Sequence, residues 1–232
     1  MKPYYQDSAV TIYHGDCREV VPTLGRFDLL LTDPPYGLGI AKKGAVGSNT
    51  TTKAKHGFRE YGNQGWDITP PNDEEVLSLV ASAKAAIVWG GNYFQFPATA
   101  CWLIWDKCQR NFSFADAEMA WTNLNRAVRI FSFSRGKLVQ ESGMHPTQKP
   151  LALMTWCIGL AGDVQTILDP FAGSGTTGRA AKDLGRKAVL IEREEKYCEI
   201  AARRMGQEVL CFDNLNTMVH QTDSPQHTAP QQ

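Results

Sequence analysis

The chain lacks the features that mark zinc-binding, secreted and membrane-spanning proteins. Its six cysteines show no C-x-x-C spacing, which argues against a zinc site or any other bound metal. No apolar run is long enough to cross a bilayer, and the first residues do not have the pattern of a signal peptide. These absences predict a reduced, cytoplasmic protein that contacts no membrane.

The sequence also lacks an excess of charge and any internal repeat. Twenty-four Lys and Arg residues balance 24 Asp and Glu residues, which excludes a protein coated in positive charge but not one with a local basic surface. With 232 residues, 43% of them hydrophobic, the chain is long enough for one substantial core. We therefore expect a single domain over residues 1–215 and a disordered tail, rich in Gln, Thr, Pro and Ser, over 216–232.

Short apolar runs predict strands, and longer periodic segments between them predict helices. The expected strands cover 10–13, 27–32, 86–89, 102–105, 128–133, 166–169 and 187–192, and the expected helices include 73–84, 151–160 and 194–205. Strands that alternate with helices are typical of a parallel sheet with helices on both faces. The fold class expected is α/β, with a Rossmann-like, mostly parallel, doubly wound sheet.

A rigid turn directly follows the strand predicted over 27–32, and its residues are Asp33, Pro34, Pro35 and Tyr36. Each proline fixes its own φ and restricts the residue before it. The Asp33 carboxylate and the Pro34 carbonyl are two acceptors, which suit the two protons of an NH2 group. Tyr36 adds a flat face on which a planar ring can stack. The turn predicts a pocket for an aromatic amine; the alternative is a strand end in which Asp and Pro serve only the turn.

A glycine-rich turn follows the strand predicted over 166–169. Gly173, Gly175 and Gly178 have the G-x-G-x-x-G spacing of a nucleotide-binding turn. Glu192 ends the next predicted strand, nineteen positions after the first glycine, where a carboxylate can accept the hydroxyls of a ribose. The order of strand, glycines, helix, strand and acid predicts an adenosine-type cofactor, and a tight connection without a ligand is the alternative.

Two details of this turn indicate which cofactor it binds. Gly178 is followed by Arg179, whereas a P-loop has Lys and then Ser or Thr, so ATP is disfavoured. Asp169 lies just before the turn, where its carboxylate would repel a pyrophosphate but attract the ammonium group of an amino acid. The sequence therefore favours S-adenosyl-L-methionine over NAD.

Together the motifs resemble those of one family, the amino-group DNA methyltransferases that modify N6 of adenine or N4 of cytosine. The turn at 33–36 is similar to their catalytic motif, 169–175 to their cofactor motif, and 145–150 to a third motif. The catalytic motif comes first, as in the permuted β-type arrangement. The likeness covers residues 10–206 and is strongest to short phage and prophage adenine N6-methyltransferases. It implies the fold of S-adenosyl-L-methionine-dependent methyltransferases. It also implies that the protein acts in the cytoplasm of a bacterial or phage-infected cell.

The resemblance implies that the target amine attacks the methyl group of S-adenosyl-L-methionine in line, on a base flipped out of the duplex. Asp33 and the Pro34 carbonyl would hold the amine, and Tyr36 would stack on the base. Family members with Asp first in this motif more often modify adenine, so N6 of adenine is the expected target. The first alternative is N4 of cytosine.

The resemblance also implies a cofactor site. Glu192 would hold the ribose, Asp16 the adenine amino group, and Lys149 would lie near the methionine carboxylate. The full set of expected cofactor-binding residues is Asp16, Cys17, His145, Thr147, Lys149, Asp169, Phe171, Gly173, Ser174, Gly175, Thr176 and Glu192.

Two basic stretches suit contact with double-stranded DNA, and we expect DNA-engaging insertions at about 37–70 and 107–145. The first holds Lys42, Lys43, Lys53, Lys55 and Arg59. A long loop of this composition is typical of a DNA-binding segment, and a solvated surface loop is its alternative. Because no separate recognition domain is visible, a homodimer is expected to cover the duplex, and a restriction endonuclease is a further possible partner.

Two other classes of protein share some of these features. A methyltransferase that acts on an RNA base or a protein glutamine would also need a receptor for a planar NH2 group. A DNA-binding accessory protein without catalysis would keep the basic stretches. The intact motifs at 33–36 and 173–175 argue against the loss of activity.

Overall fold

The computed structural model of the chain describes residues 1–36, 70–110, 115–134 and 148–207. Within these residues a nine-stranded sheet has the order β1-β2-β9-β8-β3-β4-β6-β5-β7. Its parallel centre consists of β2 (Val10–His14), β9 (Lys187–Glu192), β8 (Thr166–Asp169), β3 (Phe27–Thr32) and β4 (Ala83–Trp89). The Rossmann-like α/β fold predicted from the sequence is confirmed.

Four further strands complete the sheet: β1 (Tyr5–Gln6), β5 (Trp102–Asp106), β6 (Ala117–Thr122) and β7 (Arg129–Ser132). Strand β6 runs antiparallel to both β4 and β5, and β1 runs antiparallel to β2. The sequence did not predict β6, because Glu118 interrupts its apolar pattern. Since β6 is reversed, its first residues lie at the edge of the sheet where the parallel strands end.

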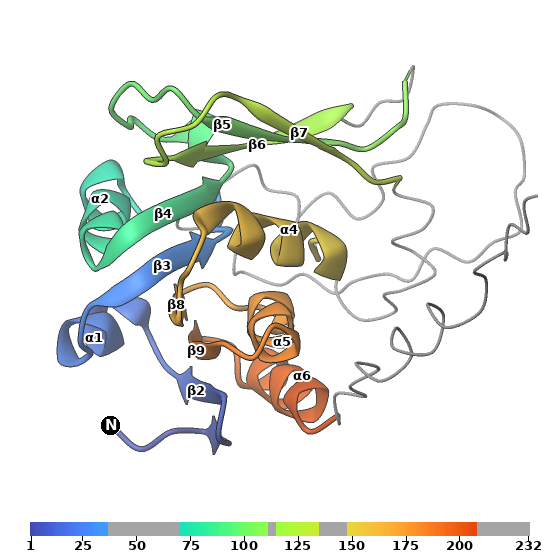
Figure 1. Cartoon of the computed structure of the whole chain (residues 1–232). Coiled ribbons are helices and arrows are strands. Elements are labelled where there is room, and N and C mark those ends of the chain that lie inside the picture. Colours follow the sequence, from blue (N-terminus) through green and yellow to red (C-terminus); the bar gives the residue numbers. More distant parts are fainter. Residues whose placement is uncertain (37–69, 111–114, 135–147, 208–232) are drawn as a thin grey trace, which may run out of the picture.

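Helices cover the two faces of the sheet, as Figure 1 shows. They are α1 (Cys17–Val20), α2 (Asp73–Ala81), α4 (Leu151–Ala161), α5 (Thr176–Asp183) and α6 (Glu195–Met205), with short 3-10 turns η1 (Val21–Thr23) and η3 (Gly91–Tyr93). Strand β3 shows how the layers form: Leu29 and Leu31 pack in the cluster with α4, α5 and α6, whereas Leu30 packs in the cluster with α1 and α2. No helix in the described part of the chain is long and apolar enough to span a membrane.

Helix α2 is shorter than the predicted range 73–84. It begins with a capping box in which Asn72 and Glu75 each accept the backbone N–H of the other. Ala and Lys favour helices, so nothing local marks the end of the helix near Ala83. Pairing with Phe27 of β3 nevertheless places Ala83 in β4, which shows tertiary pairing overriding helix propensity.

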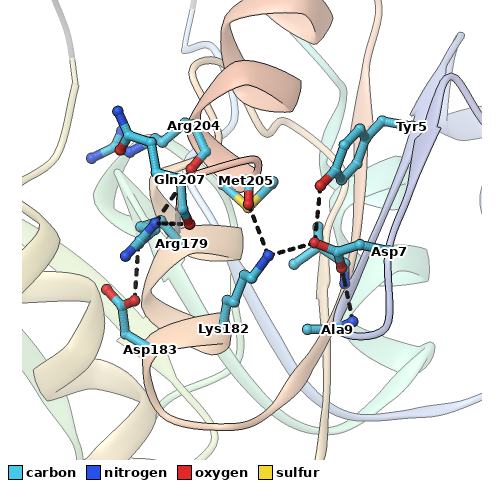
Figure 2. A network of polar contacts seen from close by, with 10 residues as sticks. Tyr5, Asp7, Ala9, Arg179, Lys182, Asp183, Arg204, Met205 and Gln207 are labelled. Atoms are coloured by element: carbon cyan, nitrogen blue, oxygen red, sulfur yellow. Dashed lines mark hydrogen bonds and ion pairs between the residues drawn. The ribbon is translucent and has the colours of Figure 1, made fainter. Parts of the chain in front are cut away.

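A polar network joins the first strands to the last helices (Figure 2). The Lys182 ammonium on α5 lies 2.6 Å from Asp7 Oδ2 and donates to the Met205 carbonyl on α6 at 2.8 Å. Tyr5 donates to the same carboxylate at 2.9 Å, and the Ala9 N–H donates to Asp7 Oδ1 at 2.8 Å. The turn between β1 and β2 is therefore fastened to α5, which follows the glycine-rich turn, and to α6.

Candidate active site

A cavity of about 560 Å³ opens at the carboxyl ends of the central strands. In parallel α/β sheets this edge is the usual place for ligands, and the volume is in the range of small-molecule sites. Strands β3, β8 and β9 end here with Thr32, Asp169 and Glu192. Of the residues expected from the sequence, the cavity is lined by Asp16, Cys17, Asp33, Pro35, Lys149, Asp169, Phe171, Gly173, Ser174, Thr176 and Glu192.

The glycine-rich turn has a conformation that requires glycine. Gly175 precedes α5 with φ +77°, and a Cβ there would lie 2.9 Å from the Cβ of Ala201. A Cβ at Gly178 would lie 2.6 Å from Leu190 Cδ1, so this glycine allows α5 to pack closely on β9. These two glycines thus allow the turn and α5 to pack closely on α6 and β9.

Two acids flank this turn, of which Asp169 is buried and Glu192 is partly buried. Asp169 accepts hydrogen bonds from the Thr32 hydroxyl at 2.8 Å and the Phe171 N–H at 3.2 Å, and burial raises its pKa to about 6. Glu192 accepts the Gly173 N–H at 2.8 Å, and burial raises its pKa as well. Both acids face the cavity with ordered carboxylates.

Asp16 caps α1 at the other side of the cavity. Its carboxylate accepts the Arg18 backbone N–H at 2.9 Å and the Arg18 guanidinium at 2.6 Å, and these bonds from Arg18 lower the pKa of Asp16. Arg18 also reaches Glu75 on α2 at 3.4 Å. Arg18 belongs to no motif, so reasoning from the sequence missed this residue.

The turn after β3 holds Asp33 between two partners. Tyr36 donates its hydroxyl to Asp33 Oδ1 at 2.6 Å, and the Lys149 ammonium pairs with Asp33 Oδ2. Burial, followed by the charge of Asp33, raises the pKa of Tyr36, so its phenol is protonated and acts as a donor. The Tyr36 ring stacks on Tyr93, with 4.7 Å between ring centroids and 19° between planes.

Gly90 makes room for that ring. It has φ +68°, and a Cβ at this position would lie 2.1 Å from Tyr36 Cε1. Tyr93 and Gly90 both belong to the segment that ends β4 and forms η3. The sequence resemblance included this segment but assigned it no role, and only the fold shows that it supports Tyr36.

Lys149 contacts the catalytic turn through Asp33. Besides Asp33, its ammonium is 3.0 Å from Glu118 Oε2 on β6. The expected contact with a cofactor carboxylate stays a prediction, and the two acidic partners were not expected. Five predicted DNA-binding residues, two predicted cofactor residues and the predicted tail lie outside the described residues; they are Lys42, Lys43, Lys53, Lys55, Arg59, His145, Thr147 and 216–232.

Comparisons with known proteins point to one family. A family model described as DNA methylase matches residues 119–203. The Type II methyltransferase M.HinfI of Haemophilus influenzae is 39% identical over an alignment that covers 89% of this chain and 71% of the relative. The Type II methyltransferase M2.DpnII of Streptococcus pneumoniae is 27% identical, with 89% and 93% covered.

Two solved structures share the fold. The cytosine-N4-specific PvuII DNA methyltransferase has a TM-score of 0.54 at 17% identity and covers 89% of this chain and 90% of its own. The structure of M1.HpyAVI has a TM-score of 0.52 at 21% identity, with 86% and 100% covered. At these identities the similarity concerns the architecture of the chain.

Proposed function

The chain belongs to the DNA methylase family and is a site-specific DNA methyltransferase, and we propose that it transfers the methyl group of S-adenosyl-L-methionine to N6 of adenine in double-stranded DNA. One observation carries the proposal. The Asp33 carboxylate and the acids Asp169 and Glu192 line the same cavity. Asp33, the acceptor for the amine, therefore lies next to a site that suits a cofactor made of an adenosine and a positively charged amino acid.

The described residues fit the cofactor. Glu192 would accept the ribose hydroxyls, and the buried carboxylate of Asp169 would attract the ammonium of the methionine part. The glycine-rich turn leaves room between these two acids for the methionine part of the cofactor. When bound, S-adenosyl-L-methionine supplies a methyl group on a positively charged sulfur.

Asp33 would hold the amine of the target base. An ionised carboxylate has about four lone-pair sites, so Asp33 can accept an amine N–H while it keeps its bonds to Tyr36 and Lys149. The Pro34 carbonyl would accept the second N–H. Both hydrogen bonds favour an amine nitrogen whose lone pair is free to attack the methyl group. Most of the catalysis then comes from positioning the reactants in a prearranged polar site.

No cysteine nucleophile is part of this mechanism. Cys17 lines the cavity, but burial raises the pKa of its thiol to about 11. A thiol with this pKa is protonated at neutral pH and is a poor nucleophile. The buried Cys17 therefore supports direct transfer to the amine.

The choice of adenine depends on Asp33 as the first residue of the catalytic turn. The test is to express the chain in a bacterial strain that lacks DNA methyltransferases and to sequence its DNA by a method that detects modified bases. We expect N6-methyladenine within one short sequence. N4-methylcytosine in its place would overturn the base assignment and retain the mechanism.

The organisation of the chain around this site belongs to the same proposal. We propose one methyltransferase domain over 1–215, with DNA-engaging insertions at about 37–70 and 107–145. Reversing the charges of Lys42 and Lys43 should weaken DNA binding and reduce its dependence on salt, because each lysine that neutralises a phosphate releases a counterion. Unchanged affinity and salt dependence would remove these two residues from the interface.

Two further partners are proposed. A homodimer would let a chain without a separate recognition domain cover its site, and sedimentation of the protein with and without duplex DNA tests this. A restriction endonuclease partner would cut the same sequence that the methyltransferase modifies. Cleavage of fully methylated DNA by a candidate endonuclease would exclude that pairing.

A further inference from the structure

Two lysines and two acids form a chain of alternating charges behind the catalytic turn. The Lys107 ammonium lies 2.6 Å from Glu118 Oε1, and the Lys149 ammonium lies 3.0 Å from Glu118 Oε2. Lys149 then pairs with Asp33. The two lysine side chains are only 9% and 5% exposed. Because unpaired buried charges are strongly unfavourable, each ammonium depends on its acidic neighbours.

The topology of the sheet brings these four residues together. Asp33 follows β3, Lys107 follows β5, and Lys149 lies just before α4. Glu118 is the second residue of the reversed strand β6 and pairs in register with Trp105. If β6 were parallel to its neighbours, its first residues would lie at the opposite edge of the sheet. The antiparallel direction of β6 thus places the Glu118 carboxylate next to Lys149.

The charge states of the chain follow from its contacts. Burial alone would raise the pKa of Glu118, but Lys149 and Lys107 outweigh it and lower the pKa to about 2. Burial alone would lower the pKa of Lys149, but Asp33 and Glu118 outweigh it and raise the pKa well above its usual value. Glu118 is therefore an anion and Lys149 a cation at neutral pH.

Glu118 reaches the reacting atoms only through Lys149. Asp33 and Lys149 line the cavity, whereas Glu118 and Lys107 do not. The groups that face Asp33 are the Tyr36 hydroxyl and the Lys149 ammonium, with Asp169 close enough for the two acids to interact. Glu118 thus contacts Lys149 without being part of the cavity lining.

On the basis of the proposed function, we propose that Glu118 is a positioning residue for methyl transfer. It anchors the Lys149 ammonium beside Asp33, so that the Asp33 carboxylate keeps one orientation toward the target amine. An ionised carboxylate offers only acceptors, which is what an NH2 donor requires. Without Glu118, the Lys149 ammonium loses one of its two acidic partners and no longer keeps one position beside Asp33.

The test compares Glu118→Gln, Glu118→Asp and the wild-type enzyme. Single-turnover methyl transfer is measured at saturating S-adenosyl-L-methionine on a duplex that carries the mapped site, and cofactor affinity is measured by calorimetry. We expect Glu118→Gln to slow transfer by about 10- to 100-fold, because a small misplacement of a reacting group has effects of this size. Cofactor affinity should change by less than about twofold, since Glu118 does not line the cavity.

The conservative variant separates positioning from simple structural support. Glu118→Asp keeps the negative charge on a side chain that is one methylene shorter, and we expect a rate between those of Glu118→Gln and the wild-type enzyme. Glu199→Gln is the matched control, because Glu199 pairs with Arg203 on the exposed side of α6; it should transfer at the wild-type rate. If Glu118→Gln does not fold, the inference is tested on Glu118→Asp alone, by its rate of methyl transfer and its cofactor affinity.

Three results would overturn the inference. The first is a folded Glu118→Gln enzyme that transfers methyl groups at the wild-type rate. The second is a loss of cofactor affinity in Glu118→Gln that is as large as its loss of rate. The third is a Glu118→Asp enzyme that is no faster than Glu118→Gln. If Glu118→Gln is unfolded, a wild-type rate in Glu118→Asp also overturns it. N6-methyladenine made by the wild-type enzyme in the same assay sustains the proposed function in all these cases, so the two failures are distinguishable.

Discussion

At the scale of single residues, Asp169 should make cofactor binding depend on pH. Burial raises its pKa to about 6, so the protonated form dominates below that pH and has no charge to attract an ammonium. We expect the affinity for S-adenosyl-L-methionine to rise between pH 5 and pH 7.5, by up to about tenfold per pH unit below pH 6. Calorimetric titration at several pH values measures this.

Replacing Asp169 by a neutral residue separates its contribution to the pH dependence of cofactor binding from that of other acids in the cavity. The pKa of Glu192 is also raised by burial, so both acids could contribute to the slope. Asp169→Asn should bind the cofactor more weakly and should show a flatter pH profile over the same interval. Equal slopes in the wild-type protein and Asp169→Asn would remove Asp169 from the ammonium site.

Gly90 provides a second prediction at this scale. Gly90→Ala would place a Cβ 2.1 Å from the Tyr36 ring, so we expect the ring to shift and methyl transfer to fall while cofactor affinity is retained. Gly185→Ala is the control, because Gly185 has a similar φ of +66° and nothing within 4 Å of the added atom. Both variants should lose about 1–2 kcal/mol of unfolding free energy from left-handed backbone strain.

The comparison of the two glycine variants identifies the role of Tyr36. Only Gly90→Ala should lower the single-turnover rate beyond the effect of its lower stability. A folded Gly90→Ala enzyme that transfers methyl groups as fast as Gly185→Ala would show that the position of the Tyr36 ring does not matter for the reaction.

At the scale of elements, the Asp7 network ties the β1–β2 turn to α5 and α6. Burial would raise the pKa of Asp7, but Lys182 and the Val10 and Ala9 N–H groups lower it from 3.8 to about 2. The stabilisation is therefore complete above pH 3.8 and is lost as the pH falls through 2. We expect Asp7→Asn to lower the unfolding free energy at pH 7 by about 1–3 kcal/mol, because hydrogen bonds to a charged group are removed.

The matched control for this network is an exposed acid. Glu199→Gln breaks an ion pair whose two side chains are 54% and 77% exposed, and it should change the unfolding free energy by less than about 1 kcal/mol. The deficit of Asp7→Asn relative to wild type should shrink between pH 4 and pH 2 in denaturant titrations. A deficit that is constant over this interval would contradict the role of the Asp7 charge.

The elements that the sequence predicted are those with continuous apolar runs. Strands β3, β8 and β9 agree with their predicted bounds, since their buried residues form unbroken hydrophobic segments. Strand β6 and the end of α2 were missed, because their structure is set by pairing with distant strands. Local patterns contain no information about such partners.

At the scale of the whole molecule, the same limit applies to the site. The sequence identified Asp33, Asp169 and Glu192 because each follows or ends a recognisable strand, and the fold brings all three to one cavity. It could not identify Glu118 or Gly90 as neighbours of the catalytic turn. Their proximity depends on the reversed strand β6 and on the packing of η3.

The central claim is that the Asp33 carboxylate directs methyl transfer to the exocyclic amine of a DNA base. The most direct measurement is to incubate purified wild-type enzyme and Asp33→Ala with duplex DNA and S-adenosyl-L-methionine, digest the DNA to nucleosides and identify methylated products by mass spectrometry. The account predicts N6-methyladenine from the wild-type enzyme and at least about 100-fold less from Asp33→Ala, with cofactor affinity retained. Substantial product from Asp33→Ala, or no methylated nucleoside from a wild-type enzyme that binds the cofactor, would contradict it.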